Sequence, residues 1–123
     1  MKKIIIDTNA LLAISELKID IFTELEKTCD FPYNLQVIEG TMTELEKIKQ
    51  EQRGKYKHAA RVAELLIVSK KIKIIPSEGD VDDILVEKSQ NGALILTQDR
   101  ELKRRLQKPY LTIRQQKKIV LIM

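Results

Sequence analysis

Residues 3–14 read KIIIDTNALLAI, and this stretch decides the fold class. Residues 4–6 are three consecutive isoleucines, a β-branched apolar run that is typical of a strand buried on both faces. The next residues, Asp7, Thr8 and Asn9, are types that cap the N-termini of helices, and an apolar segment follows at residues 10–14. The stretch therefore predicts a strand, a turn and a helix in succession.

The rest of the chain continues this alternation of strands and helices. Short apolar runs predict strands at residues 35–38, 73–75, 93–96, 110–113 and 119–122. Longer periodic segments predict helices at residues 20–28, 41–49, 56–70, 80–90 and 100–107. Helix 41–49 is expected to be capped by Thr41, with Glu44 completing a capping box. Such alternation indicates right-handed βαβ units, and hence an α/β fold with a mostly parallel sheet between helical layers.

Length and composition favour a single domain that spans residues 1–123. Hydrophobic residues make up 43% of the chain, enough for a core without a disulfide framework, and the one cysteine excludes an internal disulfide. No apolar run approaches the roughly 20 residues that span a bilayer. Only three apolar residues follow the basic start at Lys2 and Lys3, so we expect no secretory signal. These features predict a soluble, cytoplasmic protein with no membrane partner.

Charge is distributed unevenly along the chain, whose net charge is +4. Residues 1–46 carry 4 basic and 9 acidic residues, whereas residues 100–123 carry 8 basic residues and 1 acidic residue. This asymmetry suggests a polyanionic partner such as RNA, although on charge alone a lysine-rich solvated surface is the favoured interpretation. The candidate phosphate contacts surround the polar loop at residues 50–55 or lie in the last helix, and they are Lys47, Arg53, Lys55, Arg100, Lys103 and Arg104.

Acidic residues follow four of the predicted strands. Asp7 and Asp99 come just after strands, while Glu44 and Asp82 lie in the helices that follow two other strands. In open α/β sheets, functional sites gather outside the carboxyl ends of the strands, so these side chains can share one edge. Each acid alone is explained by a helix cap or by the helix dipole. The coincidence of four acids predicts a site for Mg²⁺ or Mn²⁺, because clustered carboxylates repel one another until a hard cation offsets their charge.

Four motifs in order give the chain a family resemblance. The segments are IIDTNALL at residues 5–12, TELEKI at 43–48, VDDIL at 81–85 and ALILTQDREL at 93–102. Together they resemble the PIN domain family of metal-dependent nucleases. The resemblance covers nearly the whole chain, and it implies a three-layer α/β/α sandwich that hydrolyses single-stranded RNA with Mg²⁺ or Mn²⁺.

The resemblance also assigns roles to individual residues. The acidic positions of the family match Asp7, Glu44, Asp82 and Asp99. Asp7, Asp82 and Asp99 would hold the metal, and Glu44 would position the attacking water. Asp82 is favoured over its neighbour Asp83, which is the fallback. Asn9 and Thr97 match positions that orient carboxylates by hydrogen bonds.

The biological setting stays open at this point. The basic segments at residues 103–106, 110–114 and 117–118 look most like archaeal-type nucleases that process ribosomal RNA, which implies a ribosome-assembly partner. VapC-type toxins are similar as well and would bring an antitoxin partner, although Leu102 stands where many toxins carry an aromatic residue. A non-catalytic RNA-binding scaffold is the third alternative. Consecutive apolar residues at 65–68 indicate either a deeply buried helix or a homodimer contact.

Two other enzyme classes fit the motifs poorly. A haloacid-dehalogenase-like phosphatase needs a second aspartate two residues after Asp7, and that position is Asn9. A receiver domain needs an aspartate after the third strand, where Pro76 and Ser77 stand. The single histidine, His58, has no partners for a zinc cluster or a catalytic triad.

Overall fold

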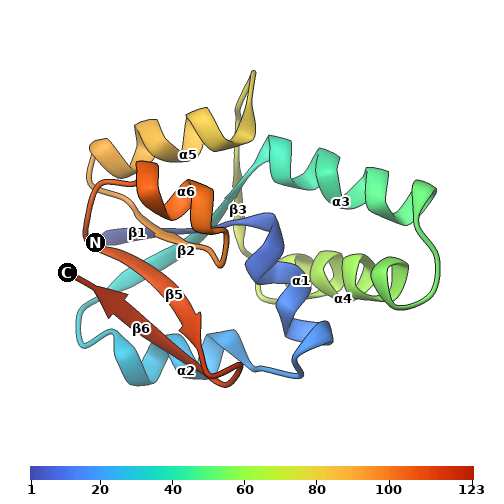
Figure 1. Ribbon diagram of the computed structural model, residues 1–123, viewed down its shortest axis with the longest axis horizontal. Coiled ribbons are helices and arrows are strands. Elements are labelled where there is room, and N and C mark those ends of the chain that lie inside the picture. The colour runs from blue at the N-terminus through green and yellow to red at the C-terminus, as the bar shows by residue number, and fades with distance from the viewer.

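A computed structural model describes the whole chain, residues 1–123, and contains one sheet of six strands (Figure 1). The strands are β1 (Lys2–Ile6), β2 (Tyr33–Ile38), β3 (Lys73–Ile75), β4 (Leu94–Leu96), β5 (Tyr110–Arg114) and β6 (Lys118–Ile122). Their order across the sheet is β3-β2-β1-β4-β5-β6. All neighbours are parallel except β6, which runs antiparallel to β5. The expected α/β class with a mostly parallel sheet is confirmed.

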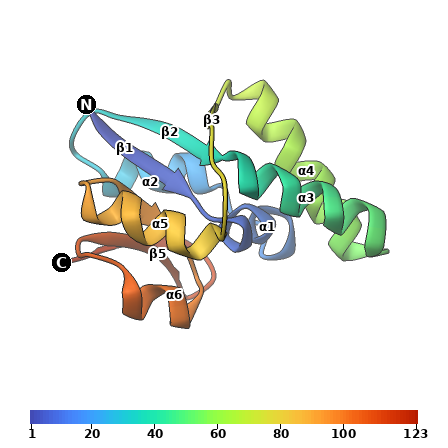
Figure 2. The ribbon, with the colours of Figure 1, turned by 90° about the horizontal axis from the view of Figure 1, so that it is seen from above.

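Six helices flank this sheet: α1 (Thr8–Glu16), α2 (Ile21–Thr28), α3 (Glu39–Glu51), α4 (Lys55–Ser69), α5 (Val81–Gln90) and α6 (Arg100–Arg105). Figures 1 and 2 show α5 and α6 on one side of the sheet and α1 and α2 on the other, so the fold has three layers. Helix α3 continues from β2 and packs with α4 beside α1, and the turn between α3 and α4 projects away from the sheet.

The inner strand β1 supplies both halves of the core. Ile4 and Ile6 pack into the larger cluster with α1, α2 and α4, whereas Ile5 packs into the smaller cluster with α5 and α6. This division follows from the pleat, because successive side chains of a strand point to opposite faces. The isoleucine run therefore accounts for a strand that helices cover on both faces.

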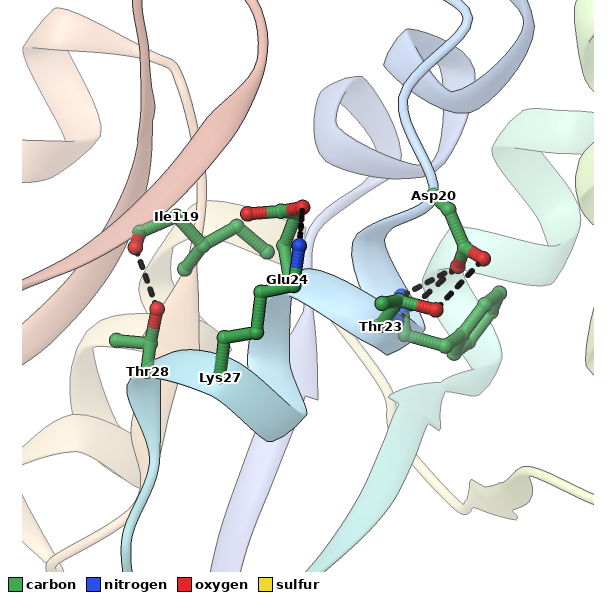
Figure 3. Close-up of polar contacts among 7 residues, drawn as sticks. Asp20, Thr23, Glu24, Lys27, Thr28 and Ile119 are labelled. Atoms are coloured by element: carbon green, nitrogen blue, oxygen red, sulfur yellow. Dashed lines mark hydrogen bonds and ion pairs between the residues drawn. The ribbon is translucent and has the colours of Figure 1, made fainter.

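Helix α2 is fixed at both ends by polar contacts, which Figure 3 shows. The carboxylate of Asp20 accepts hydrogen bonds from the backbone N–H groups of Phe22 and Thr23, each at 3.1 Å. At the other end, the hydroxyl of Thr28 donates to the carbonyl oxygen of Ile119 at 2.6 Å. The second contact connects α2 to β6, the strand at one edge of the sheet.

The expected capping box at Thr41 and Glu44 is wrong. Helix α3 begins at Glu39, directly after β2, and Thr41 lies inside the helix with 0% of its surface exposed and no hydrogen-bond partner for its hydroxyl. The backbone N–H of Gly40 donates instead to the hydroxyl of Ser77 at 3.1 Å. A residue 37 positions away thus satisfies the first turn of α3, and a local sequence pattern cannot reveal such a partner.

The expectation that α4 is deeply buried is wrong as well. Ala59, Ala63 and Ile67 face the core, but Leu65 and Val68 are 69% and 76% exposed. The homodimer contact inferred for this helix stays a prediction. None of the helices is long and apolar enough to cross a membrane.

Candidate active site

The tripeptide Asp7-Thr8-Asn9 lies at the carboxyl end of β1, and each of its side chains contacts a different part of the molecule. Asp7 continues the pairing of β1 with β4, because its backbone N–H donates to the carbonyl of Leu96 at 2.9 Å. Its carboxylate is 5% exposed; one oxygen accepts from the N–H of Thr8 at 2.8 Å and the other from the hydroxyl of Thr97 at 2.7 Å. Asp7 is therefore held rigidly between two neighbouring strand ends.

Thr8 brings α3 to this edge of the sheet. Its hydroxyl donates to a carboxylate oxygen of Glu44 at 2.7 Å. Thr8 is buried whereas Glu44 is exposed, so one carboxylate oxygen of Glu44 is oriented by the protein and the other is left for solvent or a ligand. The sequence interpretation treated Thr8 only as a capping residue, and its position in the triplet was the one available signal.

Asn9 and Thr97 organise the turn that follows β4. The side-chain oxygen of Asn9 accepts from the backbone N–H of Gln98 at 3.0 Å. The hydroxyl of Thr97 donates to Asp7 and accepts from the N–H of Asp99 at 3.0 Å. Thr97 thus links Asp7 to the backbone of Asp99, whereas Asn9 contacts no carboxylate and accepts instead from Gln98 and from the hydroxyl of Thr97 at 3.3 Å.

Asp99 caps α6 and keeps one carboxylate oxygen without a protein partner. Its other oxygen accepts from the backbone N–H groups of Glu101 at 2.8 Å and Leu102 at 3.2 Å. The helix-cap role considered from the sequence is therefore real. It is compatible with a ligand, because the remaining oxygen makes no hydrogen bond within the protein.

Asp82 and Asp83 differ in their surroundings. Asp82 lies in the first turn of α5, and its pKa is raised first by partial burial and then by the negative charge of Asp99. Asp83 is exposed and forms an ion pair with Arg105 at 2.5 Å. The charge of Asp99 thus acts on Asp82, whereas Asp83 is paired with Arg105, a cation that also lowers the pKa of Asp82.

The buried carboxylate of Asp7 has the largest shift among these acids. Its pKa rises from 3.8 to about 6, mainly because burial penalises the charged form, and the hydrogen bonds from Thr97 and Thr8 oppose this effect only in part. The charges of Asp82 and Glu44 raise it further. None of Asp7, Glu44, Asp82 and Asp99 takes part in an ion pair of the structure. The four acids therefore form a patch of negative charge without an ion pair, although Arg105 lowers the pKa of Asp82 and Lys103 interacts with the charge of Asp99.

The donor set of this patch fits a hard divalent cation. All of its ligands are carboxylate oxygens, which Mg²⁺ and Mn²⁺ prefer, and Mg²⁺ needs only one or two carboxylates because it keeps several waters. No three acidic side chains converge closely enough, as they lie, to hold one ion together.

The basic residues that were expected to contact RNA fall into two groups. Lys47 shares a groove of about 520 Å³ with Glu44. Lys103 lies near Arg100 and Arg114, and partial burial together with these two cations lowers its pKa. This basic cluster (Arg100, Lys103 and Arg114) is adjacent to Asp99, whose charge acts on Lys103 in the opposite direction. Arg114 was not among the expected contacts, because it is distant in sequence from the other two.

The other expected contacts are placed differently. Arg104 is paired with Glu101 at 2.6 Å on the exposed side of α6. Arg53 and Lys55 lie at the turn between α3 and α4, which Figure 1 shows at the end of α3 that points away from the sheet. The structure does not bring these two residues beside the carboxylates. His58 is exposed on α4 and Cys29 is buried at the end of α2, so neither contributes to the site.

Comparison with known proteins agrees with this geometry. The sequence profile described as "PIN like domain" matches residues 4–116, which include all four acidic positions. The chain belongs to the PIN-like domain family. Ribonuclease VapC9 of Archaeoglobus fulgidus is 32% identical over 103 residues, covering 82% of this chain and 73% of that protein. Ribonuclease VapC4 of Methanocaldococcus jannaschii is 27% identical over 125 residues, covering 95% of this chain and 94% of that protein.

A solved structure is also similar to this PIN-like domain. The match is titled "Structure of the PIN domain endonuclease Utp24"; it has a TM-score of 0.75 and 26% sequence identity, and it covers 97% of this chain and 90% of that one. The similarity extends over nearly the whole chain and therefore includes the residues from Asp7 to Asp99. Nucleases of this family generally use divalent metal ions.

Proposed function

We propose that this PIN-like domain is a metal-dependent endoribonuclease that hydrolyses phosphodiester bonds of single-stranded RNA. The observation that carries the proposal is the set of four acidic side chains at one edge of the sheet, none of them paired with a cation. The ribonuclease names of the two VapC relatives and the endonuclease title of the similar structure support it.

In this mechanism Asp7, Asp82 and Asp99 would hold Mg²⁺ or Mn²⁺. Such an ion, when bound, activates water and offsets the negative charge that develops on the phosphodiester. Thr97 orients Asp7, and through its contact with the N–H of Asp99 it fixes the turn that carries the second ligand. Asn9 holds the same turn by its hydrogen bond with Gln98. These two residues position the ligands without touching the substrate.

Glu44 positions the attacking water in this proposal. Its carboxylate is exposed, and the Thr8 hydroxyl fixes the direction of one of its oxygens. The water oxygen forms the new bond to phosphorus, the bond from phosphorus to the 3′ oxygen breaks, and the leaving oxygen takes up a proton. The products are a 5′-phosphate and a 3′-hydroxyl. The basic cluster next to Asp99 and the side chain of Lys47 would contact phosphates on either side of the cleaved bond.

The test compares the wild type with Asp7→Asn and Asp99→Asn on an end-labelled single-stranded RNA in Mn²⁺, in Mg²⁺ and in EDTA. We expect cleavage by the wild type in metal and a loss of roughly 100-fold or more in EDTA and in both variants. Asp82→Asn should behave in the same way. Asp83→Asn is the matched control and should retain activity, because Asp83 is exposed and paired with Arg105.

Activity that survives in both the Asp7 and Asp99 variants would assign the cleavage to another site or to a contaminant. RNA binding without cleavage in any metal would favour the scaffold alternative. Equal losses in the Asp82 and Asp83 variants would contradict the assignment of the metal ligand to Asp82.

Two biological settings suit this chemistry. The two VapC relatives favour a toxin that an antitoxin partner controls. The basic C-terminal segments, which resemble those of nucleases that process ribosomal RNA, favour such processing, and the match to the Utp24 endonuclease over 97% of the chain is compatible with it. Expression of the chain in a bacterial host separates them: a toxin should arrest growth and Asp7→Asn should abolish the arrest, whereas a processing enzyme should leave growth unaffected.

A further inference from the structure

A second cavity lies on the face of the sheet that α5 covers. Its volume is about 500 Å³, which is within the range of cavities that take small ligands. Its walls come from the start of β1, from Gln36 in β2, from Lys73 and Ile75 in β3, and from the C-terminal end of α5. None of the four carboxylates of the candidate active site lines it, since those lie at the carboxyl ends of the strands.

This cavity is lined by positive charge alone. Its charged side chains are Lys2, Lys3, Lys73 and Lys88, joined by the terminal residue Met1, and no aspartate or glutamate is among its lining residues. None of these four lysines takes part in an ion pair of the structure. What distinguishes these lysines is that they line one concave surface together. A concave surface lined by one sign of charge concentrates ligands of the opposite sign.

A buried amide opens into the same cavity. Gln36 lies within β2 between the apolar residues Leu35 and Val37, is only 5% exposed, and lines the cavity. The register places it beside Ile5 on one side and beside Lys73 on the other, in one row across three strands. A polar side chain at such a position is costly unless it finds a partner, and a ligand in the cavity can supply one in place of water.

We propose that this cavity binds a phosphate-bearing ligand of nucleotide size. The lysines contact the phosphate oxygens, and the Gln36 amide makes a directional hydrogen bond that an inorganic ion alone would not require. The phosphates belong either to a free nucleotide or to a nucleotide of an RNA strand. The proposal rests on the cavity and its lining, independently of the nuclease chemistry proposed for the opposite edge.

The test measures binding by isothermal titration calorimetry in EDTA, so that no RNA is cleaved. The probes are ADP, inorganic phosphate and a short single-stranded RNA, each titrated into the wild type, Lys73→Glu, Gln36→Glu and Gln36→Leu. Lys18→Glu is the matched control, because Lys18 is an exposed lysine between α1 and α2 and does not line this cavity. Circular dichroism and a thermal melt establish that each variant is folded.

We expect ADP to bind the wild type and Lys18→Glu with equal affinity. Lys73→Glu and Gln36→Glu should weaken ADP by about tenfold or more, since each places a negative charge beside the phosphates. Gln36→Leu should weaken ADP but leave inorganic phosphate unchanged. If RNA binds and ADP does not, and the same variants weaken the RNA, the phosphates come from an RNA strand.

The proposal is overturned if no probe binds, or if binding is the same in the cavity variants and in Lys18→Glu. This outcome is distinguishable from a failure of the proposed nuclease. Asp7→Asn should bind ADP as the wild type does, and the cavity variants that fold should still cleave a short RNA in Mn²⁺.

Discussion

At the scale of single residues, the buried carboxylate of Asp7 lowers the stability of the fold although it is a proposed ligand of the active site. Its carboxylate is buried at the end of an inner strand, where its charged form lacks the solvation that it has in the unfolded chain. The pKa of Asp7 is about 6 in the folded protein, against 3.8 ordinarily. The folded state therefore binds a proton more tightly than the unfolded state does. In the absence of metal, this difference lowers the free energy of unfolding as the pH rises from about 4 to about 6.

The first prediction follows from that sign. Asp7→Asn removes the ionisation, so the variant should gain up to about 3 kcal/mol over the wild type at pH 7.5, and the gain should be absent near pH 4. Urea denaturation of both proteins in EDTA at pH 4, 6 and 7.5 measures this difference. Asp83→Asn, at an exposed and paired position, should show no such trend. A gap between Asp7→Asn and the wild type that does not change with pH would contradict the raised pKa.

At the scale of elements, the close approach of α3 and α5 sets the spacing of two acids. A Cβ added at Gly40 would lie 2.7 Å from a methyl carbon of Val81, so these helix starts are nearly in contact. The hydroxyl of Ser77 accepts from the N–H of Gly40, and the N–H of Ser77 donates to Glu39 at 2.8 Å. These contacts fix the helix that carries Glu44 against the helix that carries Asp82.

Gly40→Ala should therefore destabilise the protein although alanine is the better helix former. The overlap with Val81 should cost about 1–3 kcal/mol, and the helix propensity of alanine offsets up to about 1 kcal/mol of this. The substitution should also lower the rate of RNA cleavage, because moving α3 away from α5 changes the distance between Glu44 and Asp82. Thermal denaturation and the RNA assay measure both effects. Adding Val81→Ala should restore much of the activity, and a lack of rescue would show that contact with Val81 is not the cause.

The same elements show how far a sequence can predict this structure. The isoleucine run and the following triplet predicted β1 and the start of α1, because strand burial and helix capping are local effects. The cap of α3 could not be predicted, since the partner of Gly40 is Ser77 on a distant loop. Likewise, the family resemblance favoured Asp82 over Asp83, but the ion pair of Asp83 with Arg105 depends on how α6 packs beside α5 and could not be predicted. The roles of the four acids remain predictions that the proposed variants test.

At the scale of the whole molecule, basic residues from the C-terminal part of the chain gather on one part of the surface. Arg100, Lys103 and Arg114 come from α6 and from the end of β5, yet they are close enough for two of them to lower the pKa of Lys103. Charges of the same sign held together against their repulsion are typical of a surface that binds a polyanion. Part of the basic charge in residues 100–123 is thus adjacent to the acid-rich edge.

Binding of single-stranded RNA, measured in EDTA at several salt concentrations, tests this basic cluster. Each phosphate contact on single-stranded RNA contributes about 0.7 to the slope of log K against log salt. The double variant Lys103→Ala, Arg114→Ala should bind more weakly and reduce that slope by about 1.4. Lys27→Ala, on α2 and paired with Glu24, should leave the slope unchanged. An unchanged slope in the double variant would exclude the cluster from RNA contact.

The position of β1 inside the sheet also determines how activity is lost on heating. Local opening in proteins begins at loops and chain ends, while inner strands exchange their amide protons only when the whole domain unfolds. Asp7, Thr8 and Asn9 continue directly from such a strand, and their contacts reach α3 and the turn after β4. Heat inactivation should therefore coincide with global melting rather than precede it, so that the enzyme retains full activity until the fold itself is lost.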